Sequence, residues 1–165
     1  MFGLAVARAA VGPPGPPLLP LFRLPTEFFM SPVVRRIVAV LVAFLAAAVF
    51  VMLGDWLSHK FFPTPGIDST DMVQVEGATR AGLIPLKALI VMAAGWVVGA
   101  FVGGTVALKI GREGGRGATM IFAALFTIAT IANLVMIPHP AWMWFVGVVA
   151  VPLAAIVAGR DRSAG

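Results

Sequence analysis

The chain has 165 residues, of which 60% are hydrophobic and 12% are charged, and its mean hydropathy is +1.00. Such a composition leaves too few polar side chains to cover a water-facing surface, which excludes an ordinary soluble domain. The net charge of +5 does not indicate nucleic acid as a partner, because the basic residues gather at the ends of apolar runs and form no stripe. Cysteine is absent, which excludes disulfides, thiolate chemistry and Cys-ligated metals.

Residues 1–29 are rich in proline, with Pro-Pro-Gly-Pro-Pro at 13–17, and proline interrupts a helix because it lacks the backbone donor. We expect a disordered N-terminal extension, since the prolines also break the apolar core that a signal peptide requires. Met30 is followed by a short basic segment and then by the first apolar run. We interpret Met30 as the native initiator.

Four apolar runs follow, at residues 37–54, 88–108, 118–137 and 141–158. Each has about 18 to 21 residues and spans roughly 27–32 Å as a helix, which matches the hydrocarbon core of a bilayer. The runs lack the two-residue alternation of membrane strands, which favours helices. The sequence predicts an all-α integral membrane protein: one four-helix transmembrane domain over residues 30–160 with a short tail at 161–165.

The connections between the runs contain local signals as well. Asp68 to Asp71 is typical of a helix N-cap, which predicts a short surface helix from about Ser69 to Gly82. The glycine-rich segment 111–117 lacks the Gly-Lys-Ser ending of a phosphate-binding loop and is interpreted as a tight hairpin between two helices. Pro152 should kink the last run, because it cannot donate to the carbonyl of Val148.

The distribution of Lys and Arg predicts the orientation in the membrane. Nine lie in the segments before the first run, between the second and third, and after the fourth, whereas three lie in the remaining connections. The positive-inside rule places both termini in the cytoplasm. The alternative is three spans with a re-entrant last run. The two groups are Arg8, Arg23, Arg35, Arg36, Lys109, Arg112, Arg116, Arg160 and Arg162 against Lys60, Arg80 and Lys87.

Small residues recur every four positions in the second run, at Gly95, Gly99, Gly103 and Ala107. Such a stripe lies on one face of a helix and lets another backbone approach closely. We expect it to pack inside the bundle; a seam between copies of the chain and a pore-lining face are the alternatives.

Thr130 and Asn133 are polar residues inside the third run, and they share a helix face. Polar groups are costly at this depth, and an interhelical hydrogen bond would offset the cost. Such a bond contributes about 0.5 to 2 kcal/mol. No Asp, Glu, Lys or Arg lies inside the four runs, whereas a solute pathway usually needs such groups. We therefore interpret the pair as structural, with a transport role as the alternative.

Asp55, His59 and His139 are expected to form a polar cluster on the outer face. These residue types could form a metal or pH-sensing site, but their spacing matches no zinc-binding motif, so neither a metal nor another cofactor is predicted. Neither histidine lies in the context of a nucleophile. No catalytic residue is predicted, and the chain is not expected to be an enzyme.

Three segments, at residues 59–68, 95–104 and 133–142, resemble a group of small bacterial four-span membrane proteins of unknown function; they include Gly-Trp-x-x-Gly-x-Phe-x-Gly-Gly and Pro-His-Pro-x-Trp. The resemblance covers about residues 30–160 and implies a bacterial inner-membrane location, but no catalytic or binding residue. We expect a non-enzymatic subunit or accessory factor that acts through helix packing, with the lipid bilayer and a second copy or another membrane protein as partners. A small oligomeric transporter or channel is the alternative.

Overall fold

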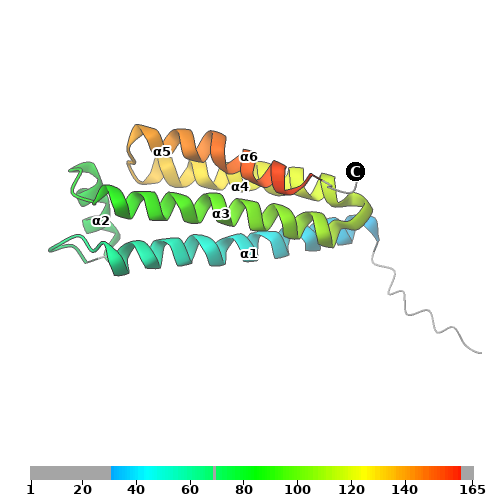
Figure 1. Ribbon diagram of the computed structural model, residues 1–165, viewed down its shortest axis with the longest axis horizontal. Helices are drawn as coiled ribbons and strands as arrows, with labels where there is room; N and C mark the ends of the chain where they lie inside the picture. The colour runs from blue at the N-terminus through cyan, green and yellow to red at the C-terminus, as the bar shows by residue number, and fades with distance from the viewer. Residues whose placement is uncertain (1–30, 69, 161–165) are drawn as a thin grey trace, which may run out of the picture.

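A computed structural model describes residues 31–68 and 70–160 of the chain (Figure 1). The predicted N-terminal extension, the proposed initiator Met30 and the tail 161–165 lie outside the described residues. Within the described residues the chain is all-helical, without strands. The helices are α1 Pro32–Phe61, α2 Met72–Arg80, α3 Leu86–Gly111, η1 Arg112–Gly114, α4 Gly115–Met136, α5 Ala141–Phe145, η2 Val146–Ala150 and α6 Val151–Ala158.

Three helical stretches of the described chain are long and apolar enough to cross a membrane: Pro32–Phe61, Leu86–Met136 and Ala141–Ala158. The second includes α3, the short η1 turn and α4, and the chain reverses direction at η1 (Figure 1). These observations confirm the prediction of an all-α chain with helices of membrane-spanning length.

Helix α1 is longer than the apolar run that predicts it. It begins at Pro32, where the side chain of Ser31 accepts a hydrogen bond from the Val34 amide at 3.2 Å, and it continues to Phe61. The helix therefore continues about two turns beyond Gly54, where the apolar run ends. Hydropathy marks where a helix would leave the hydrocarbon, but the backbone remains helical into water, because polar residues also form helices.

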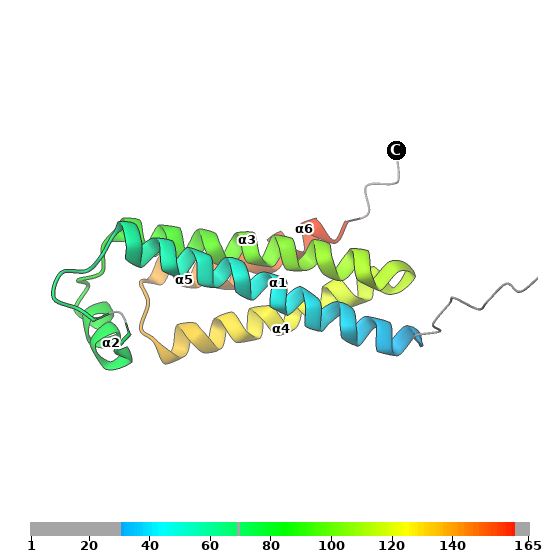
Figure 2. The same ribbon diagram turned by 90° about the horizontal axis from the view of Figure 1, so that it is seen from below.

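The surface helix α2 is present with narrower bounds than predicted. The carboxylate of Asp71 caps it by accepting from the amides of Val73 at 2.9 Å and Gln74 at 3.4 Å. Arg80 in its last turn donates to Glu76 at 2.6 Å. The cap and the ion pair keep this short helix formed across one end of the molecule (Figure 2).

Helix α3 lies at the centre of the packing and contacts α1, α4 and α6. Helix α1 runs beside α3 along its length, and α6 packs against the other side (Figures 1 and 2). Helix α4 contacts α3 near η1 and diverges from it toward α2 (Figure 2). The beginning of α1, the end of α6 and η1 share one end of the molecule, and α2 occupies the other (Figure 1).

Three phenylalanine rings join α1 to α4 where the two helices cross. Phe44 meets Phe122 and Phe126 edge to face, with ring centroids 5.2 and 5.9 Å apart, and the latter two rings stack at 5.3 Å. Edge-to-face pairs are favoured by the ring quadrupoles. This aromatic cluster, Phe44 with Phe122 and Phe126, closes the space between the helices on the side of η1.

Where Pro152 is expected to kink the last run, a π-helical turn, η2, lies directly before α6. The amide of Val151 donates to the carbonyl of Val146, five residues back instead of four. A wider turn accommodates the proline ring within an otherwise continuous rod of α5, η2 and α6 (Figure 1).

Candidate binding cavity at the α2 end

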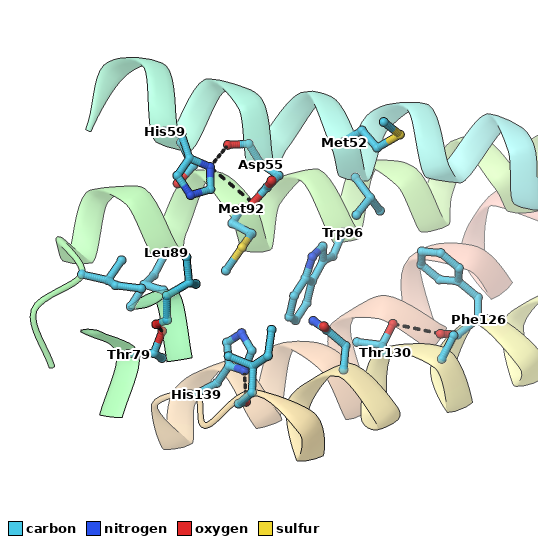
Figure 3. A pocket seen from close by; sticks show the side chains of 17 residues that line it. Met52, Asp55, His59, Thr79, Leu89, Met92, Trp96, Phe126, Thr130 and His139 are labelled. Atoms are coloured by element: carbon cyan, nitrogen blue, oxygen red, sulfur yellow. Dashed lines mark hydrogen bonds and ion pairs between the residues drawn. The ribbon is translucent and has the colours of Figure 1, made fainter. Parts of the chain in front are cut away.

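A cavity of about 430 Å³ lies between α1, α3 and α4, with α2 across its end (Figure 3). Helix α4 diverges from α3 beyond the aromatic cluster (Figure 2), and the cavity lies where the helices are apart. The two sets of polar residues expected separately from the sequence, the outer-face cluster and the pair in the third run, both line it. Its polar lining residues are Asp55, Ser58, His59, Thr79, Thr130, Asn133 and His139.

Three polar lining residues, Asp55, Ser58 and His59, lie on the turns of α1 that extend beyond the apolar run. The Nδ1 of His59 is 2.9 Å from the backbone oxygen of Asp55 and 3.6 Å from its carboxylate Oδ1. Because a carbonyl oxygen can only accept, Nδ1 carries the hydrogen in this arrangement. In the neutral ring, Nε2 is then a hydrogen-bond acceptor.

His139 lies in the turn between α4 and α5, on the other side of the cavity from His59 (Figure 3). Its Nδ1 donates to the backbone oxygen of Ile137, and its ring meets Trp96 of α3 edge to face at 5.8 Å. Burial lowers the pKa of His139, and the bond to Ile137 opposes this only in part. The ring is thus held neutral, with Nε2 as an acceptor.

The outer-face polar cluster predicted from the sequence is divided between two walls. Asp55 and His59 lie together on α1, whereas His139 lies opposite them (Figure 3). In residues 31–68 and 70–160, no group of three or more His, Asp or Glu side chains has the proximity needed to hold a metal ion. The three residues therefore line one cavity without forming a compact cluster.

Thr130 and Asn133 project from α4 into the cavity wall. The hydroxyl of Thr130 donates to the Phe126 carbonyl of its own helix at 2.9 Å, so its bond differs from the interhelical one expected. A threonine side chain can reach the carbonyl four residues back, and this local bond forms without a partner helix. Asn133 is partly buried on the same wall.

The small residues of α3 contact different neighbours along the helix. A methyl group added to Gly95 would lie 3.0 Å from the Cα of Gly54, and one added to Gly99 would lie 2.9 Å from the Ala47 carbonyl, both on α1. One added to Gly103 would instead overlap the ring of Phe122 on α4. Steps of four residues turn about 40° beyond a full rotation, so the stripe winds around α3 from one partner to the next.

Two further small residues of α3 pack against neighbouring helices, one from the predicted stripe and one outside it. Ala107, the last predicted member, is completely buried. Gly104 was not singled out, although a methyl group added to it would overlap the Ala155 carbonyl of α6. Gly104 directly follows Gly103, and such a pair is the sequence signal that α3 has small residues toward two neighbours at this level.

A second residue that the sequence did not single out is Thr119 of α4. Its hydroxyl donates to the carbonyl of Gly104 on α3 at 3.2 Å, and the side chain is buried. Nothing in the sequence distinguishes it from Thr127, whose hydroxyl bonds within α4. Only the packing shows which threonine joins two helices.

The cavity combines an apolar inner part with hydrogen-bonding groups at its α2 end, an arrangement suited to non-covalent binding of a small molecule. Its inner part is lined by Met92, Trp96 and Phe126. Comparisons with protein-family models, with curated proteins and with solved structures find no match for the chain.

Proposed function

We propose that the chain is a four-span protein of the bacterial inner membrane, with both termini in the cytoplasm, that acts without catalysis as a subunit or accessory factor. The observation that carries this proposal is the packing of α3, whose glycines bring the backbones of α1 and α6 into contact with it. Backbone contact of this kind is how helices associate in lipid, where no hydrophobic gradient drives them together.

The positions of the charged residues support this topology. The basic residues near the beginning of α1, in η1 and after α6 share one end of the molecule, the end expected in the cytoplasm. The end with α2 carries Lys60, Arg80 and Lys87, together with acidic residues such as Asp55 and Glu76. This end is therefore closer to neutral, as expected outside the cytoplasm.

The outward surfaces of α1 and α4 support a role among lipids and membrane partners. Large apolar side chains of both helices point away from the rest of the chain, a surface that lipid or another membrane helix would cover. The most exposed of these on α1 and α4 include Leu45, Val49, Ile128, Val135 and Met136.

A small oligomeric transporter or channel is the second candidate, favoured by the cavity at the α2 end. A path through one copy of the chain would have to pass Phe126, the cavity-lining residue of α4 nearest to η1, and then Phe122, which is completely buried. The aromatic cluster blocks that route, which supports the accessory role over transport through a single chain.

The topology is tested by labelling single cysteines, since the chain has none of its own. Pro65→Cys lies in the connection before α2, and Glu113→Cys lies in η1; both positions are exposed. A membrane-impermeant maleimide should label residue 65 in intact spheroplasts and residue 113 only after permeabilisation. Ser163→Cys should behave like residue 113, and its labelling in intact cells would replace four spans with three.

The accessory role is tested by crosslinking a tagged copy in its native membrane. A specific membrane-protein partner that co-purifies supports it, and the mass in mild detergent distinguishes a partner from a second copy. A homo-oligomer that makes liposomes selectively permeable to a solute would contradict the accessory role and favour transport.

A further inference from the structure

The cavity opens sideways between α1 and α4. Met52 of α1 and Ala129 of α4 both line it, yet both are exposed, with Met52 71% accessible. These residues lie toward the α2 end of the apolar runs, so the opening faces the outer leaflet if the proposed membrane placement holds. A molecule dissolved in that leaflet would reach the cavity without crossing a polar surface.

The inner part of the cavity suits an apolar body. Trp96 is 4% accessible and Phe126 is 8% accessible, and both present ring surface to the cavity (Figure 3). The volume of about 430 Å³ lies within the range of sites for small molecules, roughly 300–1,000 Å³. Rings at the base of a pocket contribute contact area with little loss of side-chain freedom.

Asp55, His59 and His139 supply hydrogen-bond acceptors nearer α2, beside the hydroxyls of Ser58 and Thr79. Both His59 and His139 direct Nδ1 to a backbone carbonyl, so that Nε2 is the nitrogen that can accept from a ligand when the ring is neutral. Asp55 is the one Asp, Glu, Lys or Arg residue among the described cavity lining. Two cations of the α2 end are engaged elsewhere, since Lys60 lies over the ring of Trp56 and Arg80 pairs with Glu76. The third, Lys87, is not among the residues that line the cavity.

We propose that this cavity binds a small amphiphile from the outer leaflet, whose head donates hydrogen bonds and carries no negative charge. A primary ammonium or an alcohol has this chemistry. The head lies near Asp55, His59 and His139, and the apolar body lies against Trp96 and Phe126. Acceptors and one carboxylate attract such a head, whereas they repel a carboxylate or phosphate, so the site selects by charge as well as by shape.

Three probes with the same body test the head chemistry: 1-adamantylamine, 1-adamantanol and 1-adamantanecarboxylate. The full chain is reconstituted in phosphatidylcholine nanodiscs, and binding is measured by calorimetry at pH 7.5 with empty nanodiscs subtracted. The amine and the alcohol should bind saturably, with the carboxylate at least about tenfold weaker because its charge would be desolvated beside acceptors.

Paired variants test the position of the site. Asp55→Asn should weaken the amine about threefold and leave the alcohol unchanged, as expected for a partly exposed ion pair. Asp68→Asn is the matched control, because this exposed carboxylate lies outside the cavity. Ala129→Phe should abolish binding of the amine and the alcohol by filling the opening. Ala132→Phe, also exposed but not lining the cavity, should not.

Three results would overturn the proposal. Equal binding of all three probes, or binding that survives Ala129→Phe, would show partition into lipid instead of a site. Absence of saturable amine and alcohol binding would overturn it directly. Met52→Trp, on the other rim of the opening, serves as a second blocking variant if Ala129→Phe lowers the melting temperature. The cysteine labelling tests the membrane placement separately, so a failed ligand site is distinguished from a wrong topology.

Discussion

Gly54 of α1 and Gly95 of α3 meet backbone to backbone: a methyl group added to Gly54 would lie 2.9 Å from the Cα of Gly95. Both glycines contribute backbone atoms to this contact, so neither can move aside unless its helix shifts. The contact lies beside the cavity, since Asp55 follows one glycine and Trp96 follows the other. The separation of α1 and α3 thus sets the positions of two groups proposed to contact the ligand.

Gly95→Ala should destabilise the protein by about 1 to 3 kcal/mol, because the added methyl group forces α1 and α3 apart. The measurement is thermal unfolding in a mild detergent. Gly77→Ala is the control: a methyl group there meets nothing within 4 Å, and alanine favours the helix by up to about 1 kcal/mol. A melting temperature for Gly95→Ala equal to that of Gly77→Ala would refute the contact.

Gly103→Ala should be destabilising for a different reason, since the added methyl group overlaps the ring of Phe122. Phe122→Leu alone also destabilises, because it leaves space in the aromatic cluster. Together the two changes should cost less than their sum by about 0.5 to 3 kcal/mol, since the smaller leucine accommodates the methyl group. The double-mutant cycle is measured by unfolding, and strict additivity would contradict the proposed contact.

Thr119→Val removes the buried hydrogen bond to the Gly104 carbonyl while preserving the shape of the side chain. We expect a loss of about 0.5 to 1.5 kcal/mol, in the range of single hydrogen bonds. Thr127→Val is the matched control, because the hydroxyl of Thr127 bonds within α4. The two unfolding temperatures are compared, and a larger effect at residue 127 would assign the interhelical role to the wrong threonine.

The stability of the protein should fall on acidification because of His139. Burial lowers its pKa in the folded state below the ordinary value of 6.5, so the unfolded chain binds the proton more readily. The contribution of neutral His139 to the free energy of unfolding is fully present above pH 6.5. It is lost as the pH falls through the lowered pKa.

His139→Gln should flatten this decline between pH 7 and 5, as measured by unfolding temperature across the range. His59→Gln, the matched change at the other histidine, should retain the decline because His139 is still present. A His139→Gln variant with the slope of the unchanged protein would show that another group causes the decline.

The all-helical fold and helices of membrane-spanning length could be predicted because the apolar runs are long and lack alternation. The helix ends could not, as α1 shows: its sequence becomes polar at Asp55, but the helix continues to Phe61. Hydropathy indicates where the surroundings of a helix change from lipid to water. The backbone hydrogen bonds of the helix can continue across that boundary.

The cavity could not be predicted from the sequence, although most of its polar lining residues are candidate site residues there. Asn133, His59 and His139 belong to different segments, and only the divergence of α4 from α3 brings their positions around one space. At the crossing, Phe122 lies against Gly103 of α3, and both Phe122 and Phe126 pack against Phe44 of α1. Side-chain volumes at helix crossings determine such angles, and spacing within one segment does not report them.

The π-helical turn before Pro152 allows the continuous stretch of α5, η2 and α6 to pack against both α4 and α3. Gly147, inside the turn, lies against Leu134 and Thr130 of α4, whereas Ala155, one turn past the wide loop of backbone, lies against Gly104 of α3. The extra residue in the turn changes which face of the rod follows it. Shortening η2 by one residue would rotate the remainder of α6 by about 100°, moving Ala155 away from Gly104, whose missing side chain leaves space for the Ala155 backbone.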